Sequence, residues 1–414
     1  MPMQLGQPPD KPLHCPSACL HRSTPFYSAS PEGTLEAVSV ASLSADLFYD
    51  ILKRLDGAAL ARAGCACAEF RAISNEEDLW ENACRSLWPS TRRDDVRSLI
   101  ISIGGFRKFY ADCFTLILNK DVPLVQTNET NPFAEEWNES DYYYGDMDDL
   151  ENSLPEDFVS LIDVWYQDRV LYSKVIWGIP NSDGAIGWFY NCPFRIDLFH
   201  QSSENNENNN GEVFLSTIDD LPPVPSMEQE RKDGKLWREL NDGIKLSWII
   251  VNQKMKRAVN LTSWHPLGGQ RHWPTDTDFV LRFGSVLPAK EVLPCQVAEC
   301  ILLMKFRMTS LGNEATRECS TLALTELSMQ IEDMGGVHLN GHCSLLILKE
   351  ALSGHRSRNY DEVLESCNLY LKAQSELKEE KIRNECRFDT LCIVSGITIF
   401  AALCAMCYRK FEYF

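Results

Sequence analysis

The sequence has 414 residues, which suits two or three folded units, and its hydrophobic fraction of 44% allows a sizeable core. Its formal net charge of −19 argues against a nucleic-acid partner, because phosphates would repel an acidic surface. The 16 cysteines are scattered, which argues against a disulfide scaffold. Those in apolar patterns are expected to be buried reduced thiols, and they include Cys67, Cys84, Cys300 and Cys367.

Residues 1–40 are rich in Pro and Ser, and they contain no apolar run of the kind that a secretory signal needs. We expect this segment to be disordered, because it offers little apolar surface to bury. A plastid transit peptide has a similar composition and is the alternative interpretation.

The segment Leu43–Pro89 contains three short apolar patterns with helical spacing. In the first, Leu47, Ile51 and Leu55 recur every four residues and form a stripe, which Phe48 and Leu52 widen. Ser44 or Asp46 can cap its start, and Asp56-Gly57 is expected to end it.

A second helix is expected from Ala58, with Cys67 and Phe70 facing inward, and a third from near Glu76, with Leu79 and Trp80 on its apolar face. A unit of under 50 residues buries little surface by itself. We therefore expect the segment to dock onto a partner.

The order of these residues resembles the F-box. That family usually begins Leu-Pro and continues with Cys, a basic residue, any residue, Trp and Arg; here Ser44, Ala68 and Phe70 depart from that pattern. The resemblance implies binding to a Skp1-like protein and, through it, to a cullin–RING ubiquitin ligase. It places on the docking helices or in their core Leu43, Leu47, Ile51, Leu52, Leu55, Cys67, Phe70 and Trp80. The alternative is a generic three-helix bundle.

The segment 91–157 is expected to be a helical extension followed by an acidic linker. Its helical pattern over 93–118 breaks at Gly104-Gly105. Residues 121–168 contain 14 Asp or Glu and no Lys or Arg, with aromatic residues interleaved. This stretch is either an acidic surface loop or a recognition segment for a basic partner.

From 158 to 350 the pattern favours strands, so we expect a β-sandwich or barrel-like domain that selects the substrate. Val170, Tyr172, Lys174 and Ile176 alternate. A hairpin is predicted over 236–251 with its turn at 241–243. The further predicted strands are Val259–Trp264, Phe279–Phe283, Val297–Met308, Thr321–Ile331 and His338–Lys349, the last after a turn at 335–336.

Catalytic motifs were sought along the whole sequence, and none of the familiar ones appears, so no enzyme activity, cofactor or metal is predicted. His338 and His342 are expected to flank a hairpin turn rather than to bind a metal. A tryptophan-flanked loop could hold a sugar or a peptide by stacking, with a packed loop as the alternative. Its residues are Trp264, His265, His272 and Trp273.

The C-terminal part is expected to form an amphipathic, charged helix over 358–386 and a transmembrane segment over 391–408. The latter has 18 uncharged residues, about 27 Å as a helix, with six residues after it, which suggests a tail anchor. A buried core helix is the alternative. Cys407 could be palmitoylated, or Cys404 and Cys407 could be plain apolar residues.

These patterns together predict an α+β chain with an F-box over 41–90. The whole sequence also resembles plant F-box proteins with an uncharacterised C-terminal region. The expected function is a non-catalytic substrate adapter, anchored in a membrane with its bulk in the cytoplasm. The alternatives are a membrane-tethered Skp1-binding or lectin-like protein that acts without a cullin, an enzyme whose site single-sequence analysis misses, and a soluble protein of the cytoplasm or nucleus.

Overall fold

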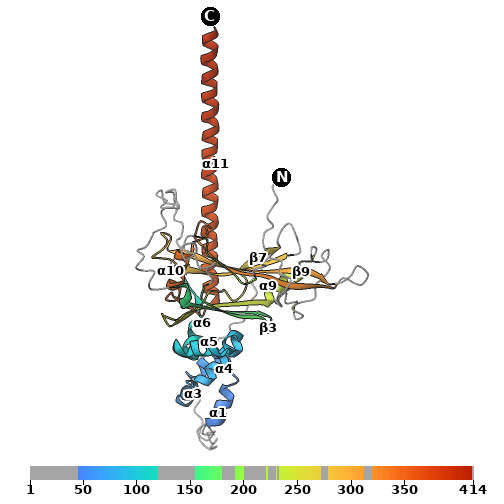
Figure 1. Ribbon diagram of the computed structural model, residues 1–414, viewed down its shortest axis with the longest axis vertical. Helices are drawn as coiled ribbons and strands as arrows, with labels where there is room; N and C mark the ends of the chain where they lie inside the picture. The colour runs from blue at the N-terminus through green and yellow to red at the C-terminus, as the bar shows by residue number, and fades with distance from the viewer. Residues whose placement is uncertain are drawn as a thin grey trace, which may run out of the picture. The chain divides into compact units, whose positions relative to one another are not determined.

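The computed structural model combines helices with two β-sheets, so the predicted α+β class is confirmed (Figure 1). It describes residues 45–119, 154–179, 192–199, 221, 230, 233–271, 278–311 and 319–412. The prediction for residues 1–40 and, within the acidic stretch 121–168, the part 121–153 lie outside the described residues. Residues 158–166 of that stretch form a buried strand rather than a surface loop.

The N-terminal part of the described chain is helical, as predicted, but residues 45–92 form four α-helices rather than three. They are α1 (Ala45–Leu52), α2 (Gly57–Ala63), α3 (Ala68–Ile73) and α4 (Glu77–Leu87). The second predicted helix is divided because the chain turns after α2, and the Cys67 thiol then accepts from the Phe70 N–H to cap α3. Asp56 likewise caps the start of α2, where its carboxylate accepts from the Ala59 N–H.

Three elements extend this helical unit: η2 (Pro89–Arg92), α5 (Asp94–Ser102) and α6 (Phe106–Phe114). The predicted break at Gly104-Gly105 is confirmed. Both glycines have positive φ, at 121° and 88°, a backbone conformation that other residues rarely adopt. The reversal between α5 and α6 therefore depends on them.

Within the described residues, the first sheet has six strands and the second has five. The first runs β11 (Arg356–Ser357), β1 (Leu116–Ile117), β6 (Arg257–Asn260), β5 (Ile244–Asn252), β2 (Phe158–Tyr166) and β3 (Arg169–Trp177). The second runs β4 (Arg195–Asp197), β10 (Cys319–Glu332), β9 (Val297–Leu311), β8 (Asp278–Pro288) and β7 (Gly268–Arg271). All pairs are antiparallel except β1 with β6.

The two sheets share one buried apolar cluster, which makes the domain sandwich-like, as predicted. The first sheet is also covered on its other face, by the helical unit. Strand β2 shows this arrangement because all nine of its residues are buried. Phe158, Ile162 and Val164 join the cluster between the sheets, whereas Val159 and Leu161 join the cluster beneath the helices.

Two predicted strands are wrong. The first half of the predicted hairpin is instead helix α9 (Lys235–Gly243), because Leu236 and Leu240 lie one helical turn apart and are both buried. The second half is β5, as predicted. The predicted strand His338–Lys349 is largely helix α10 (Gly341–Ala351), whose start is capped by the Asn340 side chain.

The C-terminal helix α11 (Tyr360–Glu412) is continuous across the predicted boundary between the charged helix and the transmembrane segment (Figure 1). Its first turns pack on the sheets through Val363, Cys367 and Tyr370. Part of α11 is long and apolar enough to cross a membrane, by length and composition, and none of that apolar window is buried.

Candidate docking surface

Helix α1 presents two aliphatic side chains to solvent. Leu47 and Ile51 are 45% and 47% exposed, and their spacing of four residues places them on one face. Phe48 and Leu52, one position further along, are buried. The helix is therefore apolar on two faces, of which only one is used in the fold, and such an exposed apolar stripe is typical of an interaction site.

Phe70 and Cys67 support α1 from the neighbouring helix α3. The rings of Phe48 and Phe70 meet edge to face at 5.1 Å between centroids. Cys67 is exposed, so its expected burial is wrong, whereas Cys84, Cys300 and Cys367 are buried free thiols. The Cys67 sulfur lies 3.4 Å from the Phe70 nitrogen and fixes the first turn of α3.

The remaining predicted docking residues lie beneath this surface or outside the described chain. Leu52 and Trp80 are buried, and the Trp80 indole N–H donates to the Ser74 carbonyl at 2.7 Å. Leu55 is half-buried against the same core, and Leu43 lies outside the described residues. Leu52 and Trp80 are therefore placed to shape the surface rather than to contact a partner.

Ion pairs hold the helices of the unit in place. Glu81 on α4 accepts from Arg97 on α5 at 2.8 Å and pairs with Arg85 at 2.7 Å. The hydrogen bond from Arg97 holds the pKa of Glu81 below its ordinary value despite partial burial. This carboxylate stays ionised and joins α4 to α5.

Trp88 connects the helical unit to the first sheet. It is fully buried, and its ring lies 5.5 Å from Phe109 and 6.3 Å from Trp264, between centroids. Trp264 also lies 6.3 Å from Trp165 on β2. These aromatic contacts place helices and strands in one core.

Asp163 adds a polar connection that the sequence analysis missed. Its buried carboxylate accepts from the Ser90 N–H at 2.9 Å, from the Ser90 hydroxyl at 2.6 Å and from the Ser173 hydroxyl at 2.6 Å. Burial raises the pKa of Asp163 to about 6, although these hydrogen bonds favour the ionised form. One feature of the sequence could have indicated this connection: Asp163 is the single acid within the apolar run 158–166. A buried carboxylate is costly there unless it has hydrogen-bond partners.

The predicted tryptophan-flanked loop is only partly described. Trp264 packs on both clusters, in keeping with the packed-loop alternative, and His265 meets Tyr360 edge to face at 6.0 Å. Burial, with the charge of Lys245, lowers the pKa of His265. His272 and Trp273 lie outside the described residues.

The described residues contain no group of three or more His, Cys, Asp or Glu that could hold a metal ion. His342 and Cys343 lie in the first turn of α10, so the predicted hairpin turn between His338 and His342 is wrong. Burial raises the pKa of the Cys84 and Cys300 thiols, which disfavours the reactive thiolate at both positions.

Several curated plant proteins are similar to this chain in sequence. The protein named "Probable F-box protein At2g36090" from Arabidopsis thaliana is 28% identical over 360 residues, 86% of this chain and 89% of its own. F-box protein At2g27310, from the same plant, is 26% identical over 88% of this chain and 95% of its own. The chain resembles plant F-box proteins along most of its length.

A further relative matches the helical region alone. F-box protein GID2 from Oryza sativa subsp. japonica is 33% identical over 81 residues, 19% of this chain and 38% of its own. The resemblance predicted from Leu43–Pro89 is thereby confirmed. No family model matches the chain, and no solved structure matches it.

Proposed function

We propose that this chain is a non-catalytic substrate adapter of an SCF-type ubiquitin ligase. Its helical unit docks onto a Skp1-like protein, which joins it to a cullin–RING ligase, and its β-rich domain binds the protein to be ubiquitinated. An adapter of this kind accelerates transfer by proximity, because it holds the substrate near the charged conjugating enzyme.

The exposed stripe on α1 carries the proposal. Leu47 and Ile51 are exposed over the buried side chains of Phe48 and Leu52 and the partly buried Phe70, so a partner can bury them without unfolding the unit. Because about half of each side chain is already covered, burying the rest of both is worth about 1.5–3 kcal/mol, a sizeable share of a specific interface. Cys67 and Leu55 lie at the margin, and Leu43 precedes the stripe in the sequence.

The direct test is binding of the purified chain to a purified Skp1-like protein. The double variant Leu47→Asp with Ile51→Asp should bind at least about 100-fold more weakly. Its free energy of unfolding should stay within about 0.5 kcal/mol of the wild type, because both side chains are exposed.

The matched control is Ile101→Asp. This isoleucine is 51% exposed on α5, outside the proposed surface, so binding should be unchanged. Equal binding by the wild type and the double variant would place the docking surface elsewhere and would count against the proposal.

We also propose that the apolar part of α11 attaches the adapter to a membrane, with the helical and β-rich parts in the cytoplasm. The support is a single apolar helix whose apolar residues from Leu391 to Met406 are unburied. The alternative function is a membrane-tethered Skp1-binding or lectin-like protein that acts without a cullin. Recovery of the Skp1-like protein without any cullin would favour it.

A further inference from the structure

Strand β3 is the edge of the first sheet among the described residues. Within the described residues, β3 pairs only with β2, from Arg169 opposite Tyr166 to Trp177 opposite Val159. No described strand pairs with its other side. A nine-residue strand with one free row of N–H and C=O groups is a template for another strand.

The edge also carries exposed apolar side chains. Val170 and Trp177 are 42% and 45% exposed, while every residue of the neighbouring strand β2 is buried. The register pairs them with Trp165 and Val159, so both lie on the face of the sheet that the helical unit covers. Natural edges usually avoid such residues because they invite pairing.

The strand is held rigidly in place. Val175 is buried, and the Ser173 hydroxyl donates to the buried Asp163 carboxylate. The same carboxylate binds Ser90 of η2, so strand and helical unit are fixed to each other. A preformed template lowers the ordering cost of a binding partner.

One exposed cation lies on this edge. Lys174 pairs in register with Ile162, so its side chain lies on the opposite face of β3 from Val170 and Trp177. On a chain of net charge −19, an exposed lysine beside an open strand edge favours a ligand whose apolar and acidic side chains alternate.

We infer that β3 binds an extended acidic peptide of a partner protein as an added strand. The peptide's main chain pairs with the open side of β3, an apolar side chain packs on Trp177 or Val170, and an acidic side chain on the other face of the peptide meets Lys174. This mode gives affinity through main-chain hydrogen bonds and specificity through alternate side chains. The inference rests on the proposed adapter function, in which this peptide belongs to the substrate.

The test uses the full chain in detergent and two fluorescein-labelled peptides, (Val-Glu)4 and (Val-Lys)4, with fluorescence anisotropy as readout. The acidic peptide should bind and the basic peptide should not. Lys174→Glu should weaken the acidic peptide about fivefold, as expected for reversing one exposed charge.

Lys372→Glu is the matched control, because it makes the same charge change on an exposed side chain of α11. It should leave binding unchanged. Methylating alternate backbone nitrogens of the acidic peptide separates strand pairing from simple charge attraction. One of the two alternate methylation patterns should abolish binding, and the other should preserve it.

Three results would overturn the inference: no binding of the acidic peptide, equal loss in Lys174→Glu and Lys372→Glu, or indifference to both methylation patterns. Self-association through β3 would overturn it too, and would appear as a dimer in sedimentation that Lys174→Glu alters. Failure of the Skp1 test with peptide binding intact would count against the adapter function and leave the strand site standing.

Discussion

At the scale of single residues, Asp163 stands out because a carboxylate is buried where the sequence is otherwise apolar. Three hydrogen bonds from Ser90 and Ser173 compensate its burial only in part, since burial raises its pKa to about 6. The folded protein therefore binds a proton at Asp163 more tightly than the unfolded chain, whose aspartate pKa is about 3.9. This group makes the free energy of unfolding fall as the pH rises from about 4 to about 6.

Replacing this carboxyl tests that dependence. Asp163→Asn should remove a decline of roughly 2 kcal/mol in the free energy of unfolding between about pH 4 and pH 6. The measurement is chemical unfolding of the full chain in detergent, followed by tryptophan fluorescence across that pH range. The same slope in wild type and variant would show that Asp163 is ionised at lower pH than its burial implies.

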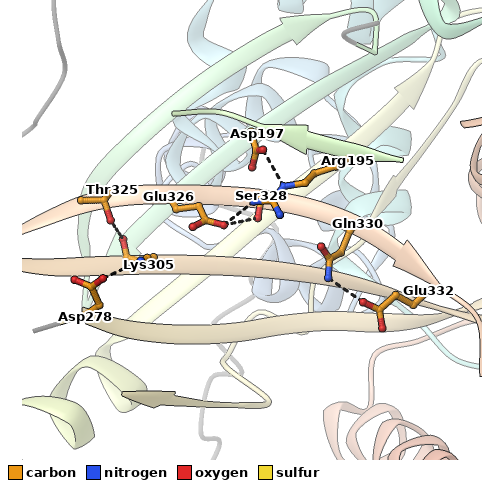
Figure 2. A network of polar contacts seen from close by, with 9 residues as sticks. All are labelled: Arg195, Asp197, Asp278, Lys305, Thr325, Glu326, Ser328, Gln330 and Glu332. Carbon is orange, nitrogen blue, oxygen red and sulfur yellow. Dashed lines mark hydrogen bonds and ion pairs between the residues drawn. The ribbon is translucent and has the colours of Figure 1, made fainter. Parts of the chain in front are cut away.

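At the scale of elements, ion pairs fasten the strands of the second sheet. Asp278 on β8 is buried and accepts from Lys305 at 2.8 Å and Arg307 at 2.9 Å, both on β9. Figure 2 shows the Asp278–Lys305 pair, and also Arg195 of β4 reaching Asp197 and Glu326. Burial acts to raise the pKa of Asp278, but the two cations outweigh it and hold the pKa well below its ordinary value.

Asp278→Asn should destabilise the fold by about 2 kcal/mol at neutral pH, the usual cost of losing hydrogen bonds to a charged group. Because the pKa is lowered, this contribution is present above about pH 4 and is lost as the pH falls further. Unfolding at pH 7 checks the size. Asp197→Asn, at an exposed pair on β4, is the control and should cost less than about 1 kcal/mol.

The elements also show what the sequence could predict. The strand-like patterns over 170–176, 279–283, 297–308 and 321–331 carried enough residues to identify β3, β8, β9 and β10, whereas β2 fell within the stretch that the sequence assigned to an acidic segment. The stretch 236–243 was too short to identify its element. The five residues from Leu236 to Leu240 fit a turn of helix and a strand equally well. Asn241-Asp242-Gly243 favoured a hairpin, but Gly243 serves a different need: a Cβ there would meet the ring of Tyr166 at 2.6 Å.

The apolar stripe on α1 was predictable in position but not in exposure. The stripe Leu47–Ile51–Leu55 was evident from spacing, whereas only the packing of Phe48 on Phe70 decides which side of α1 faces the core. The connection through Asp163 and Ser90 could not be predicted, because it joins residues 73 positions apart.

At the scale of the whole molecule, the helical unit packs on the first sheet. The first sheet in turn shares a buried apolar cluster with the second sheet and α11. The docking stripe and the β3 edge thus belong to one packed body. Beyond Leu377, the last α11 residue packed on the core, 13 residues precede the apolar run, which as a helix span about 20 Å. We expect α11 to hold the β-rich domain that far from a membrane surface.

Removing the apolar run tests the membrane attachment. A chain that ends at Asp389 should be soluble after carbonate treatment of membranes, while the full chain should remain with the membrane pellet. Ile397→Lys with Phe400→Lys is the matched control, because it keeps the length and should also release the chain. Retention of the shortened chain in the pellet would contradict membrane attachment through α11.

The side of the membrane on which the helical unit lies needs a readout of its own. Asn260, which lies in a glycosylation sequon, is fully buried, so its modification state in the folded protein reports nothing about topology. Cys65 and Cys67 are exposed thiols on the helical unit. In sealed microsomes they should react with a membrane-impermeant maleimide if that unit is cytoplasmic, and protection that detergent abolishes would place it in the lumen.

The adapter function itself is tested most directly by affinity purification of the full chain from cells, with its partners identified. We expect a Skp1-like protein and a cullin to be recovered together with the wild type and with Ile101→Asp, and both to be lost with Leu47→Asp and Ile51→Asp combined. Recovery of the Skp1-like protein without a cullin, or of both partners with the double variant, would contradict this account.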